Sequence, residues 1–154
     1  MLDLGILNCR GRIQKAYYGD EKNRIYAVTD QISLTQEDIR EVQMAKGAIA
    51  AGIELMMEEL EITYEQVDRV ILCGAFGTYM NAKSAARIGL IPEPLLSKVI
   101  AGGNAAGMGC RQITMDQKLF ALTGELVQKI EPLDLASLPQ FQRTFAKHMA
   151  FSEV

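Results

Sequence analysis

Residues Val70–Asn81, VILCGAFGTYMN, contain the clearest signal for the architecture of this chain. The first four of these residues form a short apolar run, which is typical of a strand buried on both faces of a parallel sheet. The run ends in Gly74, Ala75, Phe76 and Gly77, where no side chain is polar. Glycines at the carboxyl end of a strand either let a ligand lie directly on the backbone or serve a turn with positive φ.

The same arrangement occurs a second time. Lys98–Ala101 is predicted to be another short strand, and it leads into Gly102, Gly103 and Asn104, where a helix is expected to begin. Because the carboxyl ends of parallel strands meet at one edge, two such turns form a geometry typical of nucleotide or phosphate sites. Phe76 either borders the ligand, together with Tyr79, or is a core aromatic.

A long helix is predicted upstream of the first strand. Thr35 and Asp38 form a capping box, which satisfies free backbone N–H groups at a helix start. Apolar residues then recur every three or four positions over about 24 residues. The predicted inward stripe is Ile39, Val42, Ala45, Ile49, Ile53, Met56 and Leu60. Gly47 and Gly52 favour close approach of another backbone over direct contact with a ligand. Lys46 could reach a phosphate, but a solvated or snorkelling lysine is the favoured expectation.

Further elements are predicted downstream by local signals. Asn81 or Ser84 caps a short helix that Gly89 stops, and a second capping box at residues 114–117 starts another helix. The inward positions expected in that helix are Leu119, Leu122, Leu126 and Ile130. Residues 131–135 are predicted to be an edge strand, because proline is tolerated there. A last helix is expected to place Phe141, Phe145 and Met149 inward.

Composition excludes several classes of protein. The 154 residues, 49% of them hydrophobic, are typical of one domain, and a net charge of -3 gives no basic footprint for nucleic acid. No apolar run reaches the ~20 residues of a membrane span, so we expect a cytoplasmic protein. Three separated cysteines and one histidine, His148, indicate neither a disulfide framework nor a histidine-centred catalytic site.

Familiar nucleotide motifs are missing from the sequence. It contains no Gly-x-x-x-x-Gly-Lys-Ser/Thr loop, and residues 102–109 do not follow the Gly-x-Gly-x-x-Gly pattern with its later acidic residue. A P-loop enzyme and an ordinary dinucleotide-binding dehydrogenase are therefore disfavoured.

Four ordered blocks are residues 35–49 (TQEDIREVQMAKGAI), 72–77 (LCGAFG), 85–92 (AARIGLIP) and 103–107 (GNAAG). Together they resemble the C-terminal domain of the reductive activators of corrinoid-dependent enzymes, and the likeness runs from about Gly5 to Phe151. That family belongs to the superfamily of acetate and sugar kinases, Hsp70 and actin (ASKHA). The resemblance implies an α/β fold, namely part of a ribonuclease-H-like, actin-like ATPase lobe.

The resemblance also implies a mechanism. Such activators use ATP hydrolysis to drive an uphill electron transfer that returns a Co(II) corrinoid to Co(I), so ATP and a corrinoid protein are the implied partners. On this reading Gly74, Ala75, Phe76 and Gly77 match the adenosine-binding turn. Gly102, Gly103 and Asn104 lie in the neighbouring turn, which is either part of the site or purely structural.

The chain departs from the family pattern in two respects. A ferredoxin cluster needs four cysteines, so the iron–sulfur cluster is expected in a domain that this chain lacks. Asp3-Leu4-Gly5 is not the Asp-x-Gly-Thr phosphate hairpin, so that hairpin and the carboxylates for Mg²⁺ are expected upstream. We therefore expect residues 1–154 to be one domain, the adenosine-side part of a longer protein, with little activity alone.

Two alternatives remain open. In one, the chain is a non-catalytic interaction lobe that docks a corrinoid protein or forms a homodimer through the small-residue faces of the helices starting at Thr35 and Asn104. In the other, the chain belongs to an activator of a radical dehydratase, which the scattered cysteines disfavour.

Overall fold

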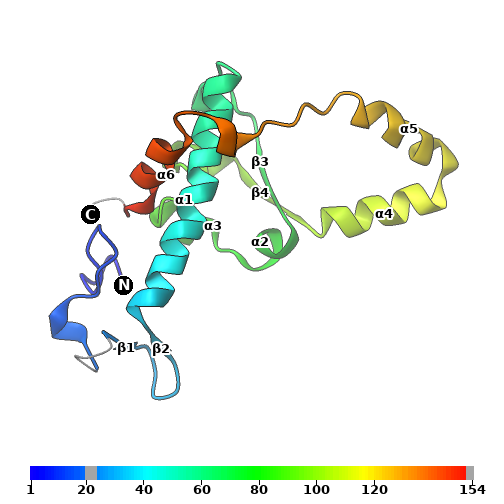
Figure 1. The fold of residues 1–154 in the computed structure, drawn as a ribbon. Helices are drawn as coiled ribbons and strands as arrows, with labels where there is room; N and C mark the ends of the chain where they lie inside the picture. The colour runs from blue at the N-terminus through cyan, green and yellow to red at the C-terminus, as the bar shows by residue number, and fades with distance from the viewer. Residues whose placement is uncertain (20–23, 152–154) are drawn as a thin grey trace.

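The computed structural model describes residues 1–19 and 24–151. One long helix, α1, crosses the molecule, with α6 beside it, the N-terminal segment at one end and the strands β3 and β4 on the other side (Figure 1). The helices are α1 (Gln36–Glu59), α2 (Gly74–Tyr79), α3 (Ala82–Arg87), α4 (Ala105–Met115), α5 (Gln117–Val127) and α6 (Phe141–Met149). The strands are β1 (Tyr26–Ala27), β2 (Ser33–Leu34), β3 (Val70–Cys73) and β4 (Val99–Gly103), and 3₁₀ turns cover Lys15–Tyr17, Tyr64–Gln66, Glu93–Lys98 and Leu135–Ser137.

Helix α1 begins where its capping box predicts. The Asp38 amide donates to Thr35 Oγ1 at 3.1 Å, and the Thr35 amide donates to Asp38 Oδ2 at 2.8 Å. The Thr35 hydroxyl also donates to Asp38 Oδ2, at 2.8 Å. The bond from the Thr35 amide, and after it the bond from the Thr35 hydroxyl, lower the pKa of the Asp38 carboxyl. The predicted length of about 24 residues is confirmed, because the helix spans 24 residues.

The predicted inward stripe of α1 is partly wrong. Ile39 is buried, but Val42, Met56 and Leu60 are 42%, 43% and 67% exposed. The buried face instead contains Gln43 and Lys46 together with small residues and Leu55. Lys46, expected in solvent, is only 2% exposed. The sequence correctly predicted a helix here, but it did not predict which face of that helix is buried. That face is the one against which the N-terminal segment and α6 pack.

The glycines of α1 allow close packing, as predicted. A Cβ atom at Gly47 would lie 3.3 Å from Met149 Cγ in α6, and one at Gly52 would lie 3.2 Å from Leu135 Cδ1. The rings of Phe141 and Phe145 in α6 stack with centroids 6.0 Å apart. The predicted last helix is confirmed, and it covers the small-residue face of α1.

Strands β3 and β4 form a parallel pair in which Val70 lies opposite Val99. One face packs on a cluster formed by Ala85, Leu90, Ile91 and Leu95. The other face is open, because Ile71 is 58% exposed and Ile100 is 43% exposed. The prediction that β3 is buried on both faces is therefore wrong for this chain, since the described residues place no second layer over it.

Helices α4 and α5 extend away from the other elements as an arm (Figure 1). Helix α5 is capped by Asp116, whose Oδ1 accepts from the Lys118 amide at 2.8 Å, so the predicted box at Thr114 is wrong. The residues expected inward are exposed: Leu119 37%, Leu122 42%, Leu126 50% and Ile130 67%. Residues 131–135 do not form a strand, because no described strand lies beside them to pair with. No helix in the described ranges is long and apolar enough to cross a membrane.

Candidate functional site

The two glycine segments meet at one edge of the β3–β4 pair. The strands run parallel, and Cys73 lies opposite Gly103 after a register shift that follows Leu72. Helix α2 begins directly at Gly74, and α4 begins just after its N-cap, Asn104. The predicted residues 74–77 and 102–104 are thus brought together at the carboxyl edge, where α2 and α4 begin.

Two glycines of this edge leave open backbone. Gly74 and Gly103 have φ values of +68° and +56°, which L side chains rarely adopt, and a Cβ atom at either would meet nothing within 4 Å. Their missing side chains therefore leave space directly above the main chain.

The other two glycines serve packing. A Cβ atom at Gly77 would overlap the carbonyl oxygen of Leu72, so Gly77 lets α2 lie against β3. A Cβ atom at Gly102 would lie 2.8 Å from Cys73 Sγ and 2.9 Å from Ile71 Cγ2. Internal contacts are thus sufficient to explain Gly77 and Gly102, and a ligand is not needed to account for them.

The remaining predicted residues have different environments. Ala75 is exposed, and Phe76 and Tyr79 on α2 are 51% and 86% exposed. The alternative prediction that Phe76 is a core aromatic is therefore wrong. Asn104 Oδ1 accepts from the Gly107 amide at 2.9 Å. Asn104 therefore fixes the start of α4, while the two aromatic rings are available for stacking at the border of the edge.

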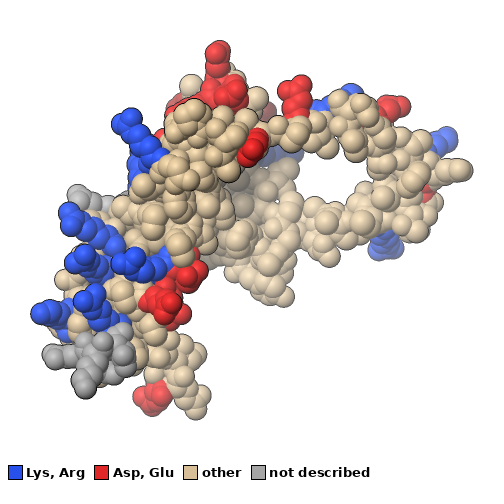
Figure 2. Space-filling view, viewed as in Figure 1, with Lys and Arg blue, Asp and Glu red and all other residues tan. Residues whose placement is uncertain are grey.

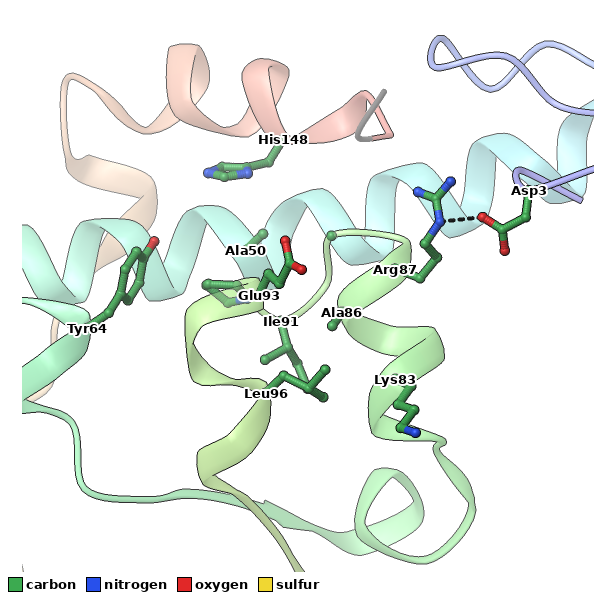
Figure 3. Close-up of a pocket in the computed structure, with 12 residues that line it drawn as sticks. Asp3, Ala50, Tyr64, Lys83, Ala86, Arg87, Ile91, Glu93, Leu96 and His148 are labelled. Atoms are coloured by element: carbon green, nitrogen blue, oxygen red, sulfur yellow. Dashed lines mark hydrogen bonds and ion pairs between the residues drawn. The ribbon is translucent and has the colours of Figure 1, made fainter. Parts of the chain in front are cut away.

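The sequence did not predict a cavity of about 570 Å³ between α1, α3 and α6. Figure 3 shows His148 reaching from α6 on one side, with Lys83 and Arg87 on α3 opposite. Arg87 Nε donates to Asp3 Oδ1 at 2.5 Å, while its buried Nη2 has no partner among the described residues. The four-residue spacing of Lys83 and Arg87 could have indicated that both lie on one face of a helix. His148 could not have been assigned to the same cavity, because it is far away in the sequence.

The described residues do not fit a metal centre. They contain no group of three or more His, Cys, Asp or Glu side chains that could hold a metal ion. Cys73 and Cys110 are exposed, Cys9 is half-buried, and all three are free thiols. An iron–sulfur cluster therefore does not fit these cysteines, and no step through such a cluster is derived from this chain.

The parallel strand pair and its helices make this an α/β protein, and its fold is consistent with an actin-like lobe. Residues 1–154 match the family described as the C-terminal domain of RACo, the ASKHA domain, and the chain belongs to that family. It is similar to a solved reductive activator for corrinoid, iron-sulfur protein, with a TM-score of 0.82 and 28% identity over 97% of this chain and 26% of that one.

Two curated relatives agree with the family. The corrinoid activation enzyme RamQ of Eubacterium limosum is 30% identical over 122 residues, which are 79% of this chain and 21% of RamQ. The [Co(II) methylated amine-specific corrinoid protein] reductase of Methanosarcina barkeri is 29% identical over 99 residues, 64% of this chain and 18% of the reductase. The chain thus spans about a fifth of the length of these relatives.

Proposed function

We propose that this chain is the adenosine-side part of an ATP-dependent activator that restores the Co(I) state of a corrinoid protein in the cytoplasm. Family membership and the names of the relatives support a role in corrinoid activation. The observation that carries the nucleotide part is the pair of open glycines, Gly74 and Gly103, at the edge where β3 and β4 end.

The edge fits the nucleoside part of ATP. Bare backbone at Gly74 and Gly103 leaves room for a flat group, and Phe76 and Tyr79 offer exposed rings beside it. Residues 74–77 and 102–104 would hold the nucleotide, with the amides at the start of α4 favouring negative charge. Hydrolysis of the bound ATP would supply the free energy for electron transfer, whereas Mg²⁺ and the iron–sulfur cluster belong, in this proposal, to other parts of the full-length protein.

The test is a titration of the ¹⁵N-labelled chain with ATP, followed by amide chemical shifts. We expect saturable shifts at Gly74, Gly77 and Gly103, and none at Gly124 in the arm. Phe76→Ala should weaken binding roughly three- to tenfold through lost stacking. The matched control is Phe120→Ala, because Phe120 is also exposed but lies on α5. Unshifted glycines at saturating ATP would refute the nucleotide part of the proposal.

A second function, an interaction lobe without catalysis, is favoured by the exposed apolar side chains of the arm. Met115, Phe120 and Val127 are 75%, 63% and 62% exposed. Gly47 of α1 packs against α6 and Gly52 packs against Leu135, so in this proposal self-association uses the arm rather than that face of α1. Light scattering across a concentration series tests dimer formation, and capture of a purified corrinoid protein without nucleotide tests docking.

A further inference from the structure

Four arginines surround a second, smaller cavity at the N-terminal end of α1. This cavity of about 310 Å³ is lined by Arg10, Arg12, Arg24 and Arg40, with Gln36, Gln43 and the chain at 149–150 completing its walls. None of these lining residues is acidic. Figure 2 shows Lys and Arg gathered on the side formed by the N-terminal segment and the start of α1, with carboxylates beside this patch.

Two glutamines of α1 hold the loop that carries Arg10 and Arg12. Gln36 Nε2 donates to the Gly11 carbonyl at 2.6 Å, and its Oε1 accepts from the Ile13 amide at 3.1 Å. Gln43, which is 6% exposed, donates through Nε2 to the carbonyls of Arg10 at 3.3 Å and Met149 at 2.9 Å. These hydrogen bonds fix the backbone that carries Arg10 and Arg12 against α1.

The loop itself is also closed by specific contacts. The Arg12 amide donates to Asn8 Oδ1 at 2.9 Å, and the Gly11 amide donates to the Asn8 carbonyl at 2.8 Å. Gly11 has a φ of +72°, and a Cβ atom there would lie 2.5 Å from the Gln43 carboxamide. Arg10 and Arg12 thus project from a preorganised turn, which reduces the entropy lost when a ligand binds.

The four arginines of this cavity form no ion pair with a described carboxylate. The ion pairs within residues 1–19 and 24–151 join Arg87 to Asp3, and Lys147 and His148 to Glu54, so none involves the four arginines. The whole chain carries a net charge of -3, so the excess of positive charge is local. Like charges around one cavity repel one another, and a bound anion would relieve that repulsion.

We propose that this arginine cavity binds a small phosphate-bearing molecule. Guanidinium groups match phosphate oxygens in planar, bidentate pairs, and a phosphate offers more charge and more acceptor oxygens than one carboxylate. The volume lies at the small end of the range for ligand sites, which favours a compact polyanion over an acidic protein segment. The cavity shares no residue with the β3–β4 edge, so this proposal does not depend on the proposed function.

The test is calorimetric titration of the chain with pyrophosphate at constant ionic strength. We expect saturable 1:1 binding and a higher melting temperature with ligand. Arg12→Gln and Arg40→Gln should each weaken binding tenfold or more. Arg111→Gln is the matched control, since it removes one exposed positive charge from α4, and it should change the affinity less than twofold. Circular dichroism verifies that each variant is folded.

Four outcomes would overturn the proposal. Absence of saturable binding would mean that the cavity does not bind phosphate groups, and an equal loss in Arg111→Gln would show only a general effect of charge. Citrate binding as tightly as pyrophosphate would assign the cavity to carboxylates. Tighter binding of an acidic peptide than of pyrophosphate would make the cavity part of a protein interface instead.

Discussion

Lys46 Nζ lies 5.2 Å from the centroid of the Phe151 ring. The same ammonium donates a hydrogen bond to the Ala150 carbonyl, and Lys46 is 2% exposed. The carboxylates within the described part of the chain form no ion pair with it. Burial lowers the pKa of Lys46 to about 8. A buried cation thus holds the chain after α6 against α1.

The first prediction concerns the pH dependence that Lys46 gives to stability. Its pKa is about 8 in the folded chain and 10.5 as the ordinary value, so between these limits the folded state binds fewer protons. The Lys46 contribution to the free energy of unfolding should therefore rise with pH in this window, by up to about 1.4 kcal/mol per pH unit. Below a pH of about 8, Lys46 is protonated in both the folded and the unfolded chain, so the full cost of burying its charge lowers the free energy of unfolding.

Chemical denaturation of wild type and Lys46→Met between pH 7.5 and 9.5 measures this effect. The difference in free energy of unfolding should move in favour of wild type as the pH rises. Lys129→Met, at an exposed lysine, controls for the loss of one charge. Parallel pH profiles for wild type and Lys46→Met would show that the amine is not desolvated.

The second prediction concerns the ion pairs between α1 and α6. Glu54 Oε1 accepts from Lys147 Nζ at 2.8 Å, and Glu54 Oε2 lies 2.7 Å from His148 Nε2. Burial alone would raise the pKa of Glu54, but the two cationic partners outweigh it and lower that pKa below 4.5. Glu54→Gln should reduce the free energy of unfolding by about 1 kcal/mol at pH 7.

The pH dependence distinguishes this ion pair from packing. Because the folded pKa is lowered, the contribution is present above pH 4.5 and is lost as the pH falls through the folded value. The curves of wild type and Glu54→Gln should therefore converge in acid. Glu58→Gln, at an exposed position one turn further along α1, should have little effect at any pH.

Local signals predicted where elements begin and end, but not which faces are covered. Thr35 and Asn81 cap helices as expected, and Gly89 follows α3 with a φ of +76°. These features depend on neighbouring residues alone. The partners of Gln43 and Lys46, by contrast, lie 106 and 104 positions away, and residue type alone assigned Lys46 to solvent.

For the candidate site, the sequence predicted which segments meet but not how closely they pack. The meeting of residues 74–77 with residues 102–104 follows from two parallel strands that end in glycine. Whether a glycine is open, as at Gly74, or packed, as at Gly77, depends on how closely α2 lies on β3, and the sequence does not contain that distance. The arginine cavity was missed because Arg12 and Arg40 are far apart in the chain.

The third prediction tests the packing role of Gly77. A methyl group there would overlap the Leu72 carbonyl oxygen, which is backbone and cannot rotate away. Gly77→Ala should therefore destabilise the chain by about 2 kcal/mol or more, and displace α2 from the strand. Gly109→Ala is the matched change in α4, where nothing lies within 4 Å, and it should stabilise by up to about 1 kcal/mol. Urea denaturation compares the free energies of unfolding of the two variants. Equal values would mean that α2 does not pack against β3.

The last prediction concerns Asn104, which joins the edge to the arm. Its side chain caps α4 by accepting from the Gly107 amide at 2.9 Å. Asn104→Ala should destabilise the first turn of α4 by about 1 kcal/mol, whereas Asn104→Asp keeps the acceptor and adds favourable charge at a helix N-terminus. Hydrogen exchange at the Gly107 amide reports the cap directly, and should accelerate roughly fivefold in the alanine variant only. If exchange is unchanged while ATP binding is lost, Asn104 acts on the nucleotide rather than on the helix.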